Sequence, residues 1–409
     1  MTTPRALEGI RVLDLGRVVA GPFASQLLAD FGAEVIKIER PGPGDDGRSM
    51  NGVAVVDRAG NRIMSEGAIF VSANRGKKSI TLDFNKEEGR EILRQLVAVS
   101  DVLVENFSVG VMDKFGLGYE ALAKVNPRLV YCSVTAYGAD GPYARMPGYD
   151  PLMQAFGGLM SINGQPDGAP GAGPVKVGSA VTDFVTGLDA AFGIMVALRY
   201  RDVTGRGQKI DTSLLDASTL LQADCLQKYL LNGEMPGRWG TEHPGGGPAG
   251  VYRAADGDVF LVAGNQQHFA PFCAVIGIPE AGIDPRFATY AARPKHRAEL
   301  NELVGKTVAT WKVRDLVEAC NKAGIPATPV NDYEMLFDDP QVKHRELSVP
   351  VAHPESDTLR LVANPVRMSE TPATYRRMPR LGEHTGSVLG DVLGYDAAKI
   401  EALKQGGVI

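Results

Sequence analysis

The sequence is poor in several features that mark particular classes of protein. Its 409 residues include only four cysteines, at positions 132, 225, 273 and 320, and no two have the CxxC spacing of zinc sites or thiol redox motifs. The six histidines are equally dispersed. We therefore expect no metal centre and no tightly bound cofactor, and the unpaired cysteines indicate the reducing cytoplasm.

Charge and hydropathy argue against two further classes. The 43 Lys and Arg residues against 48 Asp and Glu give a net charge of −5, which does not favour nucleic acid or an anionic membrane as partner. No uninterrupted apolar run reaches the roughly 20 residues of a membrane span, and the nearest, 184–200, carries Asp189. The N-terminus lacks a signal-peptide pattern. The length and the 44% hydrophobic content predict a soluble globular protein of two or three domains.

The N-terminal region alternates strand and helix patterns. Apolar strand patterns at 11–15 and 34–38 flank a helical pattern at 23–31. Such a βαβ unit predicts an α/β fold with a parallel sheet. Glu39 follows the second strand, where dinucleotide folds place a ribose-binding acid, but no GxGxxG accompanies it, so NAD binding is disfavoured.

Further elements follow the same alternation. We expect strands at 79–82, 101–105, 129–134 and 208–214, an amphipathic helix at 86–100, and a helix at 184–200 that is buried on most faces. Residues 42–76 are loop-like, and within them 50–66 is expected to be a solvated surface excursion. Lys77 and Lys78 suit either phosphate binding or the surface.

The segment 173–215 is the most distinctive in the chain. It reads GPVKVGSAVTDFVTGLDAAFGIMVALRYRDVTGRGQKIDTSLL. Asp183 lies at the entrance of the long apolar helix, where the helix dipole and free N–H groups favour a carboxylate. Gly187 and Gly193 provide small contact positions within that helix. By position alone, Asp183 is either a helix N-cap or a functional carboxylate.

Together these motifs resemble the family III coenzyme A transferases, the family of the formyl-CoA:oxalate and carnitine CoA-transferases. The resemblance runs over nearly the whole chain and is carried by LDLGRVVAGP, GAEVIKIERP, VENF, TGRGQK and PRLGEHT. It implies a CoA-transferase in which Asp183 is the nucleophile. The residues that it places beside CoA are Val18, Val19, Ala20, Arg40, Leu82, Asp83, Phe84, Asn85, Asn106, Phe107 and Lys114.

The resemblance also implies a reaction course. Asp183 attacks the thioester of an acyl-CoA donor and forms an aspartyl-acyl anhydride and a CoA thiolate, which then forms an aspartyl-CoA thioester. The acceptor carboxylic acid reverses these steps. An aspartate with its ordinary pKa near 4 is ionised at neutral pH, as a nucleophile must be. The turn Gly264-Asn265-Gln266-Gln267 resembles that of dicarboxylate-using members, which favours succinyl-CoA as donor.

Two alternatives remain at this stage. The related α-methylacyl-CoA racemases carry a His directly before the Asp that matches Asp150, and this chain has Tyr149 there. A tyrosine with a pKa near 10 is a poor proton shuttle, so transfer is favoured over a 2-methylacyl-CoA racemase. A non-catalytic CoA-binding protein is the second alternative, against which Asp183 argues. Asp150 either orients the site or binds substrate, with a plain turn residue as the alternative; Tyr149 is likewise a substrate or lid candidate.

Composition and the resemblance together divide the chain into four parts. We expect a large domain with a Rossmann-like parallel sheet from 1–230, a Gly/Pro-rich linker at 231–250, a smaller α+β domain at 251–335, and a C-terminal part at 336–409. The resemblance implies that the large domain binds CoA and that the C-terminal part returns to it. Gly245, Gly246 and Gly247 match a mobile loop that covers the active site in some relatives; a plain linker is the alternative. The family further implies an interlocked homodimer.

Overall fold

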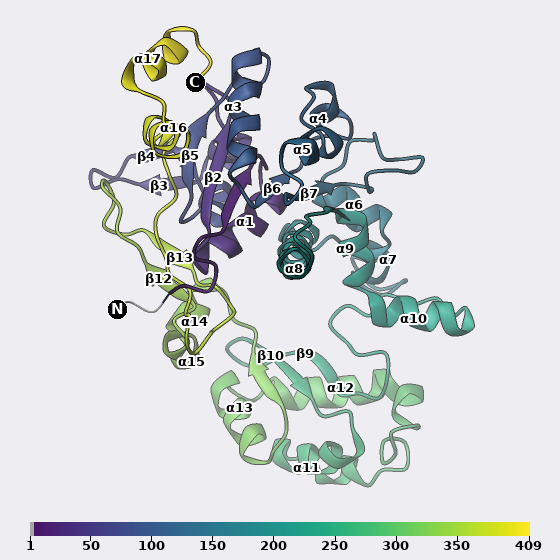
Figure 1. Cartoon of the computed structure of the whole chain (residues 1–409). Helices are drawn as coiled ribbons and strands as arrows, with labels where there is room; N and C mark the ends of the chain where they lie inside the picture. The colour runs from purple at the N-terminus through teal and green to yellow at the C-terminus, as the bar shows by residue number, and fades with distance from the viewer. Residues whose placement is uncertain (1–3) are drawn as a thin grey trace. The chain divides into compact units, whose positions relative to one another are not determined.

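The structure is a computed structural model that describes residues 4–409, in two compact units (Figure 1). The first unit contains the chain up to Leu159, Val177–Leu230 and His344–Ile409. The second contains Met160–Lys176 and Leu231–Lys343. The C-terminal segment therefore belongs to the same unit as the N-terminal strands.

A six-stranded sheet forms the centre of the first unit, and all its neighbouring strands are parallel. Its order is β5-β2-β1-β6-β7-β8, which comprises Lys78–Thr81, Glu34–Glu39, Arg11–Asp14, Val102–Glu105, Val130–Thr135 and Lys209–Ser213. The predicted α/β class is confirmed. The strand order reverses between β1 and β6, and open α/β sheets bind their ligands at the carboxyl end of such a reversal.

Helices cover both faces of this sheet. Because side chains alternate along a strand, Val12 of β1 enters one core and Leu13 enters the other. The Val12 core includes residues of α1 (Ala20–Asp30), α6 (Asp150–Phe156), α8 (Val181–Thr204) and α9 (Leu214–Leu220). The Leu13 core includes residues of α3 (Glu87–Ala98), α4 (Val111–Lys114), α5 (Tyr119–Val125) and α16 (Thr385–Leu393), with α17 (Ala397–Gln405) packed beside it.

Close packing joins the N-terminal ends of α1 and α8. A Cβ atom at Gly187 would lie 2.9 Å from the Ala20 carbonyl oxygen and 2.9 Å from the ring of Phe23, so the glycine permits the approach. The rings of Phe23 and Phe184 meet edge to face at 4.9 Å. Both helices begin about three residues earlier than predicted, which places Ala20 and Asp183 in their first turns.

The prediction that α8 is buried on most faces is wrong. One side packs in the Val12 core through Ala190, Ile194 and Ala197. The other side leaves large apolar groups in solvent, with Phe192 72% and Val203 68% exposed. By length and composition alone, α8 is also the single helix in the described chain that could cross a membrane.

The expectation that residues 42–76 are loop-like is also wrong, whereas most of the described residues in 50–66 are exposed, in agreement with the solvated surface excursion predicted there. The segment forms the 3-10 turns η1 (Asp46–Arg48) and η2 (Met50–Gly52), the hairpin β3 (Ala54–Val56) and β4 (Arg62–Gly67), and α2 (Ala68–Ala73). Phe70 of α2 packs with Leu361 and Met378, about 300 residues further along the chain. β13 (Arg360–Val362), which contains Leu361, pairs with β12 (Ser348–Pro350). Local periodicity does not reveal a core assembled from such distant segments.

The second unit combines a small antiparallel sheet with helices. The sheet order is β11-β10-β9, from Ala327–Pro329, Asp258–Val262 and Ala249–Arg253. Phe269, Leu300 and Leu316 bring α11 (Gln266–Ile276), α12 (Arg297–Val308) and α13 (Val313–Lys322) onto one buried core. The shorter helices of this unit are η3 (Pro279–Gly282), η4 (Arg293–His296) and α14 (Tyr333–Asp338). The points where the chain passes from one unit to the other lie within α7 (Leu159–Ile162), α10 (Ala223–Asn232) and α15 (Pro340–His344).

Candidate functional site

Two clefts lie at the carboxyl ends of the parallel strands of the first unit. We call the first, of about 190 Å³, the Asp183 cleft; its lining includes Arg17, Val18, Val19, Ala20, Asn106, Phe107, Tyr149 and Asp183. We call the second, of about 160 Å³, the Phe84 cleft; its lining includes Arg17, Arg40, Leu82, Asp83, Phe84, Asn85 and Phe107. Because Arg17 and Phe107 line both, the two clefts adjoin.

The clefts bring together most of the residues singled out from the sequence. Most of these directly follow a strand of the sheet, and Tyr149 and Asp183 lie at the starts of α6 and α8, so six separate segments meet at one edge. Lys114 is the exception among the residues expected beside CoA, because it is exposed at the end of α4 and lines neither cleft. Gly245, Gly246 and Gly247 lie in the second unit, where Arg297 donates hydrogen bonds to the carbonyl oxygens of Pro244 and Gly245. Their part as a lid stays a prediction.

Asp183 is not the N-cap of its helix. It is the third residue of α8, and Ala180 in the N-cap position makes no side-chain capping bond. Asp150 supplies that bond from α6: its Oδ1 accepts from the Thr182 amide at 2.8 Å and from the Thr182 hydroxyl at 2.6 Å. The structure therefore supports a role for Asp150 in orienting the start of α8. The carboxylate of Asp183 does not cap the helix.

The surroundings of Asp183 disfavour its charged form. Burial, and then the negative charge of Asp150, raise the pKa of Asp183 to about 7. Among the described residues it has neither an ion-pair partner nor a hydrogen-bond donor to its carboxylate. The ordinary pKa expected from the sequence is therefore wrong, because these two effects outweigh the helix dipole. A perturbed carboxylate in a cleft is a candidate for chemistry.

Arg17 is a cleft residue that the sequence reasoning missed. Its guanidinium lies over the ring of Phe107, 5.3 Å from the centroid, and 3.3 Å from Asp46. It is the one cationic side chain in the lining of the Asp183 cleft, as far as residues 4–409 are concerned. Its place within LDLGRVVAGP, beside three residues expected to contact CoA, was the available signal.

The remaining basic candidates have defined partners. Arg40 binds Asp46 at 2.5 Å at the edge of the Phe84 cleft, with about half of its side chain exposed. Lys77 is buried, and its Nζ pairs with Asp14 at 2.7 Å. Lys78 pairs with Glu34 at 2.6 Å. Lys77 is therefore a buried ion-pair residue and not a surface charge. Lys78 is partly exposed, in agreement with a surface position.

Tyr149 lines the Asp183 cleft directly before α6. Its side chain is 67% exposed, so the ring stands at the cleft's open side. Tyr149 and Asp183 therefore line the same cleft.

Comparisons with known proteins extend over nearly the whole chain. Residues 7–385 match the model of CoA-transferase family III. A succinate–glutarate CoA-transferase of Agrobacterium fabrum is 42% identical over 387 residues, 94% of this chain and 95% of that protein. A succinyl-CoA:mesaconate CoA-transferase of Haloarcula hispanica is 37% identical and covers 97% of this chain and 99% of its own length.

A solved structure shares the fold. The crystal structure of a CaiB/BaiF family protein from Brucella suis superposes with a TM-score of 0.86 at 39% identity, over 96% of this chain and 100% of that one. The agreement includes the α/β unit that carries both clefts.

Proposed function

The chain belongs to CoA-transferase family III, and from this premise we propose that it moves coenzyme A from succinyl-CoA to a second dicarboxylic acid with Asp183 as nucleophile. The names of its relatives, which pair succinate with glutarate or with mesaconate, support dicarboxylates as the substrate class. The observation that carries the mechanism is the unpaired, half-buried carboxylate of Asp183 in the cleft.

The electrostatics of the cleft favour the first chemical step. When Asp183 attacks the thioester carbonyl, the C–S bond breaks, the aspartyl carboxylate becomes part of a neutral anhydride, and the negative charge leaves with the CoA sulfur. Burial and Asp150 destabilise the charge of Asp183 before the attack. That destabilisation is relieved as the charge departs, so the same surroundings that raise the pKa assist the transfer.

The thiolate then attacks the aspartyl carbonyl of the anhydride. The succinate carboxylate leaves, and Asp183 holds CoA as a thioester. The acceptor dicarboxylate attacks this thioester, and the displaced thiolate completes the exchange at the acceptor's carbonyl. One thioester is formed for each one broken, and no hydrolysis is needed.

CoA fits the two adjoining clefts in this proposal. The Phe84 cleft, with Arg40 at its edge, would take the nucleotide end, since a guanidinium is a strong phosphate ligand. The pantetheine arm would pass Phe107 to bring the thioester to Asp183. Gly245–Gly247 would close over the site and exclude water.

The racemase alternative is disfavoured. The relatives are named as transferases, and this chain has Tyr149 at the position that matches the histidine of the racemases. Exchange of deuterium into the α-carbon of a 2-methylacyl-CoA, without transfer to any acid, would reverse this preference.

The exposed face of α8 supports a homodimer. Leu188, Phe192, Val196 and Val203 lie in solvent on this helix, and Leu230 and Leu231 of α10 add further exposed apolar groups. A membrane would have to surround α8, yet Ile194 and Ala197 hold its other side in the core. We therefore propose a second copy of the chain as the cover. Sedimentation of Phe192→Asp should show monomer where the unchanged protein shows dimer; an unchanged mass would count against this face.

The activity test combines a substrate screen with two nucleophile variants. Purified protein is incubated with succinyl-CoA and glutarate or mesaconate, and mass spectrometry detects the new acyl-CoA. Asp183→Ala and Asp183→Asn should both be inactive. Asp189→Asn is the matched control, because Asp189 lies on the same helix and burial also raises its pKa. Substantial transfer by both Asp183 variants would sink the nucleophile assignment.

A further inference from the structure

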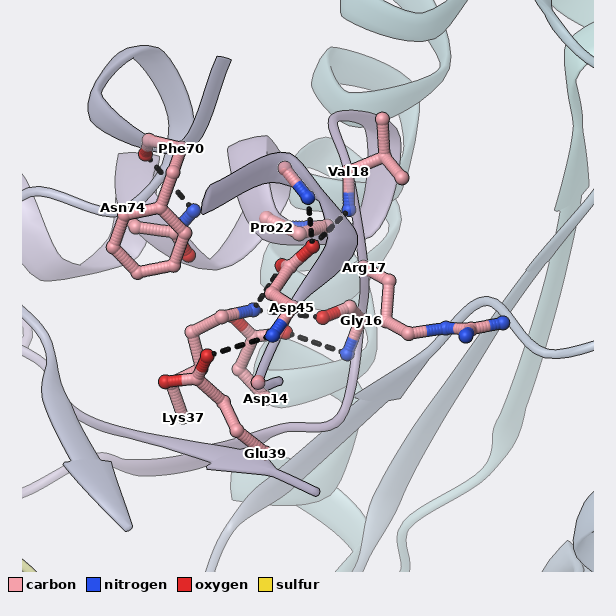
Figure 2. A network of polar contacts seen from close by, with 12 residues as sticks. Asp14, Gly16, Arg17, Val18, Pro22, Lys37, Glu39, Asp45, Phe70 and Asn74 are labelled. Atoms are coloured by element: carbon pink, nitrogen blue, oxygen red, sulfur yellow. Dashed lines mark hydrogen bonds and ion pairs between the residues drawn. The ribbon is translucent and has the colours of Figure 1, made fainter. Parts of the chain in front are cut away.

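In the loop between β1 and α1, side chains form hydrogen bonds with the backbone of Gly16, Arg17 and Val18; Figure 2 shows those at Gly16 and Val18. The amide of Gly16 donates to Asp14 Oδ1 at 2.8 Å, and its carbonyl oxygen accepts from Lys37 Nζ at 2.8 Å. Asn106 binds Arg17 twice: its Oδ1 accepts from the Arg17 amide, and its Nδ2 donates to the Arg17 carbonyl oxygen, both at 2.8 Å. The side chain of Arg17 points away from these contacts (Figure 2).

Val18 completes the loop in a conformation that valine rarely adopts. Its φ is 65°, in the left-handed region that disfavours β-branched residues. Its amide donates to Asp45 Oδ1 at 3.0 Å, and the same oxygen accepts from the Gly47 amide at 2.8 Å. The only side-chain partner that the described structure gives the Val18 backbone is therefore Asp45.

Asp45 is itself fixed by a buried charge. Its Oδ2 lies 2.8 Å from Lys37 Nζ, and both side chains are at most 1% exposed. Burial alone would raise the pKa of Asp45, but Lys37 and the amides of Val18 and Gly47 outweigh it and hold that pKa below its ordinary value. Lys37 also lies 3.9 Å from Asp14, which pairs with Lys77. We call Asp14, Lys37, Asp45 and Lys77 the buried charge cluster.

The loop leads directly into the Asp183 cleft. Arg17, Val18, Val19 and Ala20 all line it, and α1 begins at Ala20 against α8. A change of φ at Val18 would rotate the chain on both sides of it. The conformation of this one residue thus sets where the loop meets a ligand.

We propose that Asp45, anchored by Lys37, is a positioning residue that keeps Val18 left-handed and so shapes the Asp183 cleft for CoA. The inference rests on the proposed function, because it takes CoA as the ligand of this cleft. Asp45 does not line the Asp183 cleft, on which it acts through the backbone of Val18. It does line the adjoining Phe84 cleft, although it is only 2% exposed, so a direct effect on CoA there must be separated from an effect through Val18.

The test is a double-variant cycle with Val18→Gly, because glycine adopts a left-handed φ without steric cost. CoA affinity by titration calorimetry and the KM for succinyl-CoA are measured for Asp45→Ala with valine and with glycine at position 18. With valine, we expect Asp45→Ala to weaken CoA binding about tenfold and to raise KM with little change in kcat. With glycine, we expect a loss of less than about threefold.

A matched control separates positioning from general stability. Asp30 and Arg75 form another buried ion pair of the first unit, 2.6 Å apart, which makes no contact with the loop. Asp30→Ala should show no coupling to Val18→Gly. Because Asp45→Ala leaves Lys37 unpaired and could prevent folding, Asp45→Ala with Lys37→Met is tested in parallel; removing both charges avoids that penalty.

The outcomes are distinct. Equal losses of affinity with valine and glycine at position 18, or no loss at all, would overturn the positioning role. If the unchanged protein binds CoA but transfers nothing, the proposed function fails while the affinity cycle still decides the role of Asp45. If the unchanged protein binds no CoA, both fall.

Discussion

Asp14, which is buried, and Asp183, which is half-buried, are carboxylates of the same unit with opposite surroundings. Asp14 lies 2.7 Å from Lys77, accepts from Ser25 at 2.9 Å, and is fully buried. Burial opposes its charge, but the two lysines of the buried charge cluster outweigh it and lower its pKa. Asp183 meets burial and the charge of Asp150, and its pKa rises to about 7.

This difference in surroundings indicates different roles: Asp14 stabilises the structure, whereas Asp183 is the candidate reactive group. A buried carboxylate with matched cations is a fixed part of the structure, and its charge orders the loop at Gly16 (Figure 2). A half-buried carboxylate without a cation, such as Asp183, carries a charge that a reaction can remove. Both groups serve the same cleft, one through the shape of the loop and the other, as we propose, through its own reactivity.

The largest expected effect is on activity. Asp183→Asn should lower kcat/KM for transfer by at least about 10³-fold, as removal of a nucleophile does. Asp189→Asn should stay within about threefold of the unchanged protein, since that carboxylate lies further along the helix. Initial rates of glutaryl-CoA formation measure both. Comparable losses of kcat/KM in Asp183→Asn and Asp189→Asn would contradict a specific role for Asp183 as the nucleophile.

The next effect is on stability. Asp14→Ala leaves Lys77 without its carboxylate and should lower the free energy of unfolding by about 3–5 kcal/mol. Urea unfolding followed by circular dichroism measures it. A loss below about 1 kcal/mol would show that the buried charge cluster is not a scaffold of the kind described.

Asp183→Asn should raise the free energy of unfolding, whereas Asp14→Ala should lower it. The folded-state pKa of Asp183 is raised, so ionisation costs the folded protein stability as pH rises from about 4 to about 7. Asparagine does not titrate, and the variant should therefore be more stable at pH 8 by about 1–3 kcal/mol, with a smaller gain at pH 5. Urea unfolding at both pH values tests this; equal or lower stability at pH 8 would contradict the raised pKa.

The smallest expected effect is on the pH dependence of kcat/KM. Transfer requires ionised Asp183, so kcat/KM should fall as pH drops through about 7. Asp150→Asn removes a neighbouring negative charge, while its carbonyl oxygen can still accept from Thr182. In this variant the acid limb of the pH–rate profile should move to lower pH. An acid limb that does not move would show that Asp150 does not contribute to the raised pKa of Asp183.

The sequence predicted those features that depend on local pattern. The apolar runs of β1 and β2 lie on either side of a helical pattern, and this strand–helix–strand order predicted their parallel pairing. The motifs after these strands converge on one sheet edge because parallel strands share their carboxyl ends.

Features that depend on distant contacts were out of reach. Asp150 caps α8 across 32 residues, and no spacing rule reveals that bond or the raised pKa that Asp150 causes. Phe70 packs with Leu361, so α2 had no local signal strong enough to mark it as structured. The exposed side of α8 was invisible because its apolar residues run all round the helix.

The most direct test of the account is to trap the covalent state of Asp183. The protein is incubated with succinyl-CoA, hydroxylamine is added, and peptides are sequenced by mass spectrometry. Hydroxylamine converts a thioester or an anhydride to a hydroxamate, so the account predicts a hydroxamate at Asp183 only when succinyl-CoA is present. An unmodified Asp183 in a protein that is transferring CoA, or a hydroxamate at Asp189 instead, would contradict it.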